Sequence, residues 1–422
     1  MPPSFQGTNI GLIKAHNLRA ILQTLLFESQ LSRVQLAERT SLSTTTITNL
    51  IAELVDQGLV VETDGEMAKT QNHIGRPRTG LRLAGEARAA VGLSIQANGL
   101  DAGIVNLAGQ IQQVQSTALS PASPEEAIGA ATDLIGSLLS ERDSANDDVL
   151  GIGVAVSGLV DFESGDYTYS PDFGWRNVPL GKALSRELDM PVCIDSRARA
   201  IALGESLFGA GRMVHALACL DSSSTVETGF VVGRRIARGS PLGTGAIGHM
   251  VILPEGGDVC RCGNTGCLET LVSEPALFRA AQEFAHDDPE NKPGKVTIGS
   301  EITERSPSSN ESAGLFEREI LDRLFTAARE GDREAVRLIK ARSHYIGIAL
   351  ANLVNLFNPE LIVLGGVFRR GFDLFAPYAG EVMRQRSFDR LGDGVRLVPA
   401  SFGEGTRVTG AASLALSAFF YQ

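Results

Sequence analysis

The feature that most constrains the fold of this chain is a change of hydrophobic period near Val91. Upstream of it, apolar residues recur at the three- and four-residue spacing of amphipathic helices. Downstream, short β-rich runs such as AVGLSI and PVCIDS alternate with helices as far as a final C-terminal helix. This alternation predicts an α/β fold, in two lobes with a cleft between them. Because 422 residues exceed one ordinary core, two or three domains are expected.

Two helices joined by a short turn lie within the first 88 residues. Ser32 and Gln35 form a capping-box pair that opens the first helix, and Ser43 caps the second. The runs VVETDG and TGLRLAG follow as the strands of a wing, with GRPR at its tip. This order predicts a winged helix-turn-helix, with Ser41 at a turn position where glycine is commoner. The alternative is a three-helix cap with a threonine-rich solvent face, in which GRPR is a plain surface turn.

The second helix carries small hydroxyl and amide side chains, which suit contacts with base edges and phosphates in a major groove. Arginines on a stiff Gly-Arg-Pro backbone suit insertion into a minor groove. Residues 1–88 hold nine Lys/Arg and eight Asp/Glu, a net charge of +1, so the whole-chain charge of −11 leaves −12 on the other 334 residues. The acidic remainder of the chain repels DNA phosphates, so only residues 1–88 are suited to bind them. We predict double-stranded operator DNA as the partner of this module. The predicted DNA-contacting residues are Ser32, Arg33, Ser43, Thr44, Thr45, Thr46, Thr48, Asn49, Arg76 and Arg78.

Composition points to the cytoplasm. No apolar run reaches the roughly 18 residues that a membrane span needs. The N-terminus has no long apolar segment before a small-residue cleavage site, so no export signal is expected. Five cysteines, three of them clustered, fit a reducing compartment and a metal better than a disulfide scaffold.

Four segments of the body are distinctive: GIGVAVSGLVDFESGDYTYSPDFGWRNVPL, GAIGHM, CRCGNTGCLE and NLFNPELIVLGGV. Together they resemble the ROK family, which contains bacterial sugar kinases and sugar-responsive repressors. The repressor branch also carries an N-terminal winged helix-turn-helix that ends in a Gly-Arg-Pro arm, so the resemblance covers essentially the whole chain. It implies the two-lobed actin-like ATPase fold and a homodimer or homotetramer.

The chain departs from the ROK kinases in three motifs. The phosphate loop Asp-x-Gly-Gly-Thr aligns with SIQAN, starting at Ser94, and the second loop, Gly-Thr-Gly-x-Gly, aligns with SSTVE at 223–227. The kinase motif Glu-Asn-Asp-Ala-Asn aligns with DSRAR, so Ser196 replaces the sugar-binding asparagine and Arg197 replaces the general base. An arginine does not lose its proton at working pH and cannot accept one from a substrate hydroxyl. We therefore predict that the chain is not an enzyme.

The resemblance also implies an altered effector site. In the family, sugar hydroxyls are bound by the glutamate of Gly-Glu-x-Gly-His, which is Ala246 here, and by the glutamate after the last zinc cysteine. Arg197 and Arg199 suit an acidic ligand such as a sugar acid or sugar phosphate. The alternatives are a neutral sugar, or no effector at all, with both arginines in internal salt bridges. The predicted effector-binding residues are Ser196, Arg197, His249 and Glu269.

His249, Cys260, Cys262 and Cys267 follow the spacing His-x10-Cys-x-Cys-x4-Cys. Four such ligands match a closed tetrahedral zinc site, whereas a catalytic zinc keeps one position open for water. A DNA-reading finger needs a recognition helix after its ligands, but here LETLVSEPALF leads into the acidic body. The two glycines of CGNTGC permit the tight turns that bring the sulfurs together. We predict a structural Zn²⁺ ion, with free buried cysteines as the alternative.

These observations predict three domains and a transcriptional regulator. Residues 1–88 form the winged helix-turn-helix, residues 89–208 the N-terminal lobe, completed by the C-terminal helix at about 406–422, and residues 209–405 the C-terminal lobe with its zinc-binding loop. The polar segment 286–314 is expected to be a loop with little order. The predicted function is repression of carbohydrate-related genes by a kinase-dead body that senses a sugar or an acidic sugar derivative. The alternatives are a regulator controlled by a protein partner and, more remotely, a sugar kinase.

Overall fold

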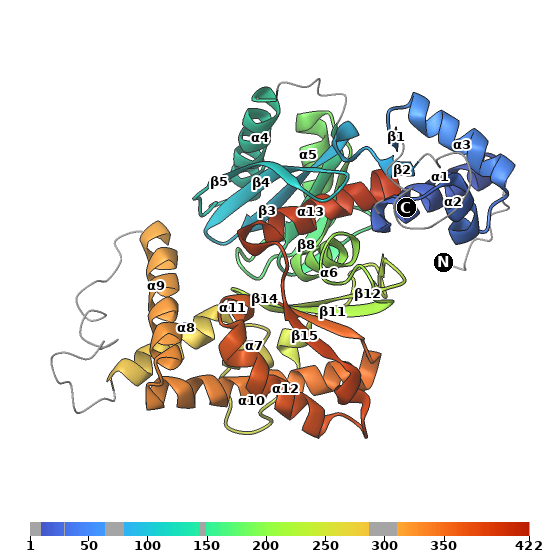
Figure 1. Cartoon of the computed structure of the whole chain (residues 1–422). Helices are drawn as coiled ribbons and strands as arrows, with labels where there is room; N and C mark the ends of the chain where they lie inside the picture. Colours follow the sequence, from blue (N-terminus) through green and yellow to red (C-terminus); the bar gives the residue numbers. More distant parts are fainter. Residues whose placement is uncertain (1–9, 29, 64–79, 143–148, 287–309, 422) are drawn as a thin grey trace.

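The computed structural model describes residues 10–28, 30–63, 80–142, 149–286 and 310–421 (Figure 1). An N-terminal winged helix-turn-helix lies beside a body of two α/β lobes, which confirms the predicted fold class. Among the described helices, none combines the length and the apolar character needed to cross a membrane. The N-terminal elements are α1 (Ile10–Phe27), α2 (Arg33–Thr40), α3 (Thr44–Asp56), β1 (Val60–Thr63) and β2 (Gly80–Leu83).

The caps predicted for α2 and α3 are present. Ser32 and Gln35 form the reciprocal capping box at the start of α2. The Ser43 hydroxyl accepts a hydrogen bond from the Thr46 amide at the start of α3. Ser41 ends α2 in the left-handed conformation, with φ of 56°, which a residue with a Cβ adopts at some cost. These local interactions set the turn between the two helices.

The first lobe is built on a five-stranded sheet in the order β10-β6-β3-β4-β5, with β10, β6 and β3 parallel. A small antiparallel sheet, β7-β8-β9, follows β6. The elements of this region are β3 (Ala89–Gln96), β4 (Gly99–Asn106), β5 (Ile111–Thr117), α4 (Pro124–Ser140), β6 (Val149–Val156), β7 (Leu159–Asp161), β8 (Asp166–Tyr169), β9 (Arg176–Val178), α5 (Leu180–Leu188), β10 (Val192–Ser196) and α6 (Arg197–Leu207).

The second lobe is built on the sheet β13-β12-β11-β14-β15, whose far face is covered by α7 to α12 (Figure 1). The sequence placed residues 286–314 in a loop, but His286 ends helix α8 and residues 310–314 belong to helix α9; residues 287–309 lie outside the described residues. The elements are β11 (Ala216–Ser222), β12 (Val226–Val232), β13 (Arg235–Ile236), α7 (Leu268–Val272), α8 (Glu274–His286), α9 (Asn310–Arg329), α10 (Arg333–Phe357), β14 (Leu361–Gly366), α11 (Val367–Arg370), α12 (Phe372–Arg386), β15 (Arg396–Pro399) and α13 (Thr406–Leu416).

Helix α13 returns to the first lobe and lies directly against its sheet. A Cβ on Gly92 would lie 2.1 Å from the carbonyl oxygen of Val408, and one on Gly153 would lie 1.9 Å from that of Ala411. Only glycine permits the helix backbone to approach the strands this closely. On the opposite face, apolar side chains of β3 pack in one cluster with those of α4 and α5. Alternation along β3 therefore places α13 on the face of the sheet away from α4 and α5.

The C-terminus contacts the winged helix-turn-helix (Figure 1). After α13 the chain forms a π-helical turn (Ser417–Tyr421), and the Gln23 side chain of α1 donates a 2.7 Å hydrogen bond to the Tyr421 carbonyl. The guanidinium of Arg234 stacks 3.7 Å above the ring centroid of Phe27. Apolar residues of α1 and α3 form one core cluster with residues of α13. The winged helix-turn-helix is thus packed against α13, which also forms part of the first lobe.

Candidate functional sites

The exposed face of α3 carries the predicted major-groove residues. Thr44, Thr45 and Asn49 are exposed and make no side-chain hydrogen bond among the described residues, so their polar groups are available to a ligand. By contrast, the hydroxyls of Ser43 and Thr46 hydrogen-bond each other at 2.8 Å at the start of the helix. The Thr48 hydroxyl is exposed and donates to the Thr44 carbonyl at 2.8 Å.

The predicted contacts on α2 are partly engaged within the protein. Ser32 is only 3% exposed and its hydroxyl caps the helix, so burial removes this side chain from the surface that DNA can reach. Arg33 forms an ion pair with Glu62 of the wing strand β1. Arg76 and Arg78, the predicted minor-groove residues, lie outside the described residues.

The structure brings His249, Cys260, Cys262 and Cys267 together. Their ligand atoms all lie within 4.8 Å of one another. Tetrahedral zinc, with Zn–S of about 2.3 Å and Zn–N of about 2.0 Å, requires S···S edges of about 3.8 Å and S···N edges of about 3.5 Å. The Sγ atoms of Cys262 and Cys267 are 3.7 Å apart, and Cys260 Sγ lies 3.5 Å from His249 Nδ1. The four side chains therefore fit one metal ion with no position left open.

The backbone of this loop explains why the cysteines converge. The Cys260 amide donates to the Asn264 carbonyl at 2.7 Å, and Gly263 turns the chain with φ of 92°. Gly266, with φ of 73°, approaches the Leu253 carbonyl so closely that a Cβ there would lie 1.7 Å from the oxygen. Burial raises the pKa of the Cys267 thiol to about 12, so without a cation this sulfur remains protonated at neutral pH.

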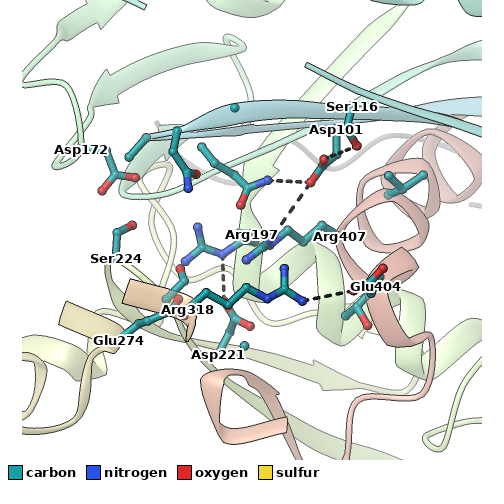
Figure 2. Close-up of a pocket in the computed structure, with 18 of the residues that line it drawn as sticks. Asp101, Ser116, Asp172, Arg197, Asp221, Ser224, Glu274, Arg318, Glu404 and Arg407 are labelled. Atoms are coloured by element: carbon teal, nitrogen blue, oxygen red, sulfur yellow. Dashed lines mark hydrogen bonds and ion pairs between the residues drawn. The ribbon is translucent and has the colours of Figure 1, made fainter. Parts of the chain in front are cut away.

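A cleft of about 1070 Å³ opens between the two lobes (Figure 2). It is lined by Gln96 at the end of β3, by residues 97–98 of the β3–β4 turn, and by Ser223 and Ser224 of the β11–β12 turn. Both segments belong to the stretches that the sequence resemblance predicted to align with the two kinase phosphate loops. Of the four predicted effector residues, Arg197 lines this cleft, whereas Ser196, His249 and Glu269 are not among its lining residues.

Arg197 is buried and fully engaged by the protein. Its Nε donates to Asp221 Oδ2 at 2.8 Å, and its terminal nitrogens donate to the hydroxyls of Ser157 and Thr225. Burial opposes its charge, but the carboxylates of Asp221 and Glu227 outweigh burial and raise the pKa of Arg197 above its ordinary value. Arg197 is therefore a permanent cation inside an ion pair that links α6 of one lobe to β11 of the other (Figure 2).

Arg199 is also held by internal partners. Its Nε donates to Asp195 Oδ1 at 2.6 Å, and a terminal nitrogen donates to the Thr244 carbonyl at 2.6 Å. Arg238 adds a second cation to the same carboxylate, at 2.9 Å from Asp195 Oδ2. Both arginines that the sequence offered to an acidic ligand thus lie in internal salt bridges, the alternative arrangement stated above.

Glu269 is held by an arginine that sequence reasoning missed. Arg261 lies between two of the clustered cysteines, and its Nε pairs with Glu269 Oε1 at 2.8 Å. Its terminal nitrogens reach the carbonyls of Pro171 in the first lobe and Ser224 in the second. The other oxygen of Glu269 accepts from the Val226 amide at 3.1 Å. The carboxylate that the sequence predicted to bind the effector is therefore occupied unless Arg261 moves.

The fold and these sites define a class: a winged helix-turn-helix joined to a two-lobed body of the sugar-kinase type. Residues 90–418 match the ROK family model, and residues 15–61 match the model described as winged helix-turn-helix DNA-binding. The chain belongs to the ROK family.

Named relatives include both regulators and kinases. The chain is 29% identical over 382 residues to the xylose repressor of Caldicellulosiruptor bescii, covering 90% of each chain. It superposes with a TM-score of 0.78 and 25% identity on a ROK family transcriptional regulator described as a homologue of the E. coli MLC protein, over 96% of this chain and 97% of that one. A Streptomyces griseus ROK glucokinase, solved with glucose and AMPPNP, matches with a TM-score of 0.64 and 25% identity over 77% of this chain and 98% of that one.

Proposed function

We propose that this protein is a DNA-binding transcriptional repressor of carbohydrate-related genes. The observation that carries the proposal is the winged helix-turn-helix, whose α3 presents free polar groups at Thr44, Thr45 and Asn49. Similarity to the xylose repressor of C. bescii across 90% of both chains supports the repressor assignment. We also propose that residues 1–88 form the DNA-binding domain and that residues 89–422 form the regulatory body.

Footprinting and gel-shift assays on the region upstream of the protein's own gene and its neighbours test DNA binding. Asn49→Ala should weaken the specific complex by about 1–3 kcal/mol, the value of one good base contact. Gln57→Ala, at the far end of the same helix, is the matched control and should bind as the unmodified protein does. Equal affinity of all three proteins for specific and random DNA would refute this assignment.

We propose that the body does not phosphorylate sugars. Arg197 stands at the general-base position and is locked in an ion pair with Asp221, and Glu227 projects a side chain where the kinases have a phosphate-loop glycine. A coupled ATP assay with a panel of neutral sugars should show no turnover above the no-sugar background. Sugar-dependent ADP release that survives removal of contaminating kinases would overturn this part of the proposal.

We propose that an effector in the inter-lobe cleft controls DNA binding by a pair of subunits. The effector can shift the equilibrium between DNA-binding and released states only by its differential affinity for them. A symmetric dimer requires a pseudo-palindromic operator with half-sites separated by one helical turn or a multiple of it. A footprint over one asymmetric half-site, together with a monomer in sedimentation, would contradict the symmetric arrangement.

We propose that a structural zinc ion is bound by His249, Cys260, Cys262 and Cys267. When bound, the ion would cross-link the loop that carries Arg261 and leads into α7. Elemental analysis of protein purified without chelator should give about one zinc per chain. Carefully purified, folded protein without zinc would refute the assignment.

A further inference from the structure

Arg407 is a cleft cation whose charge the protein leaves poorly neutralised. It lies in the first turn of α13, lines the cleft, and has a side chain that is 33% exposed. Its nearest carboxylate oxygen, Asp101 Oδ2, is 3.9 Å from Nη1, beyond hydrogen-bond distance. Asp101 already accepts hydrogen bonds from Gln96 at 2.6 Å and Ser116 at 2.7 Å. The guanidinium of Arg407 makes no hydrogen bond among the described residues.

The other cleft arginines have closer partners. Arg318 pairs with Glu404 at 3.1 Å, and Arg369 donates to the Ala400 carbonyl at 3.1 Å. Arg370 pairs with Glu274 and Asp322, and Arg197 pairs with Asp221 as described above. Figure 2 shows Arg407, Arg197 and Arg318 extending into the same space. Among these five cations, Arg407 is the one that donates no hydrogen bond to any described residue.

The cleft carboxylates do not cancel this charge. Asp221, Glu274 and Glu404 are each paired with an arginine. Burial, followed by the neighbouring Glu274 carboxylate, raises the pKa of Glu317 above its ordinary value. Burial, followed by the like charge of Arg197, lowers the pKa of Arg407, and these two effects outweigh the opposing carboxylates of Asp221, Asp101 and Glu274. The positive charge of Arg407 is therefore poorly neutralised, and a negatively charged group of a ligand would neutralise it.

A second orphaned polar group lines the cleft from the other lobe. The Ser223 hydroxyl is buried without a hydrogen-bond partner in the described structure, and the residue is 6% exposed. A buried polar group normally has a partner, because leaving it unpaired costs about 1–3 kcal/mol. Ser223 and Arg407 line one cavity, which has room for a small ligand.

We propose that the inter-lobe cleft binds a small molecule bearing a phosphate or carboxylate group, with Arg407 holding the anionic group and Ser223 donating a hydrogen bond from the opposite lobe. The planar guanidinium donates two parallel hydrogen bonds to either kind of anion. This proposal rests on the proposed effector control, and it assigns the acidic effector to Arg407 rather than to Arg197 and Arg199, which are held in buried salt bridges with Asp221 and Asp195.

The position of Arg407 supplies a route from this ligand to DNA. Arg407 begins α13, and the turn that follows this helix contacts α1 of the DNA-binding domain through Tyr421 and Gln23. A ligand that draws Arg407 toward Ser223 biases the position of α13 relative to the second lobe. Because the DNA-binding domain packs on α13, a shift of this helix changes where the DNA-binding domain lies within the subunit pair.

Calorimetric titration of the full chain tests the site directly. The probes are inorganic phosphate, glucose 6-phosphate, gluconate and uncharged glucose, which separate phosphate from carboxylate and both from a neutral sugar. At least one anionic probe should bind, and Arg407→Gln should weaken it about ten- to hundredfold, because one or two charge-assisted hydrogen bonds are lost. Arg407→Lys keeps the charge and should retain part of the affinity. Arg386→Gln, an exposed arginine on α12, is the matched control.

Two results would overturn the proposal: no binding of any anionic probe to folded protein, or equal binding to the unmodified chain and to folded Arg407→Gln. Gel shifts with the same proteins keep this failure separate from failure of the proposed function. If uncharged glucose releases the unmodified chain and Arg407→Gln from DNA equally, effector control stands and the anion site falls. If neither protein binds specific DNA, the repressor assignment falls, while the calorimetry still decides the anion site.

Discussion

The ion pair between Arg197 and Asp221 yields the sharpest stability prediction. The two side chains are 2% and 4% exposed, and Nε lies 2.8 Å from Oδ2. Asp221→Asn preserves the shape of the side chain and removes its charge, so a guanidinium remains buried without its nearest counter-ion. Breaking a buried pair from one side costs about 3–5 kcal/mol. Glu227 and the hydroxyls of Ser157 and Thr225 remain near Arg197, so we expect the lower end, about 3 kcal/mol.

Urea unfolding followed by far-UV circular dichroism measures this loss. The matched control is Asp373→Asn, which breaks the pair between Arg329 and Asp373, whose side chains are 44% and 57% exposed. An exposed pair contributes at most about 1 kcal/mol. The double variant Arg197→Met/Asp221→Leu leaves neither partner charged and should lose less stability than Asp221→Asn alone. If Asp221→Asn and Asp373→Asn lose the same free energy of unfolding, the reasoning from burial is wrong.

Three further perturbations follow from the structure. Cys262→Ser, or a strong chelator, should remove the metal and lower the thermal midpoint of unfolding, since structural zinc contributes on the order of 10 kcal/mol to folding in small zinc domains. Zinc analysis and scanning fluorimetry measure the two effects. An unchanged midpoint after loss of the metal would contradict a structural role. Ser32→Ala should lower stability by about 1 kcal/mol through loss of the cap, with DNA affinity unchanged once the protein is folded; a large loss of affinity in folded protein would instead make Ser32 a DNA contact. Gly153→Ala should lower the free energy of unfolding by about 1–3 kcal/mol or more, because its Cβ would lie 1.9 Å from the Ala411 carbonyl. Gly136→Ala on α4, whose Cβ meets no atom within 4 Å, is the control and should be neutral or slightly stabilising. Equal unfolding midpoints for the two variants would contradict the close packing of α13.

Much of the fold was accessible from the sequence because its signals are local. The capping box at Ser32 and the cap at Ser43 lie within one turn of the amides they bond, so their spacing alone identifies the two helices. The cysteine cluster spans one short loop, and its glycines leave few ways to close it. Strand and helix alternation defined the fold class, and the quoted ROK segments indicated the family.

The effector site was less accessible, because partners that are distant in the chain decide what each side chain can do. The sequence favoured Arg197 and Arg199 as cations that could bind an acidic ligand. In the structure, carboxylates from neighbouring strands neutralise both. Arg261 carried a signal, a charged residue between two candidate ligands, but its contact with Pro171 spans 90 positions. Arg407 carried no signal, since only the return of α13 to the first lobe places it in the cleft.

The sequence by itself determined the winged helix-turn-helix, the α/β body and the gathering of four metal-type ligands, because hydrophobic period, capping and loop spacing act over a few residues. Tertiary structure alone decided which polar groups are used up and which remain available. It buried Ser32 against its own helix, paired Arg33 with the wing, and left Thr44, Thr45 and Asn49 exposed. The availability of a charge depends on the nearest counter-charge and on solvent, and both are set by how distant segments pack.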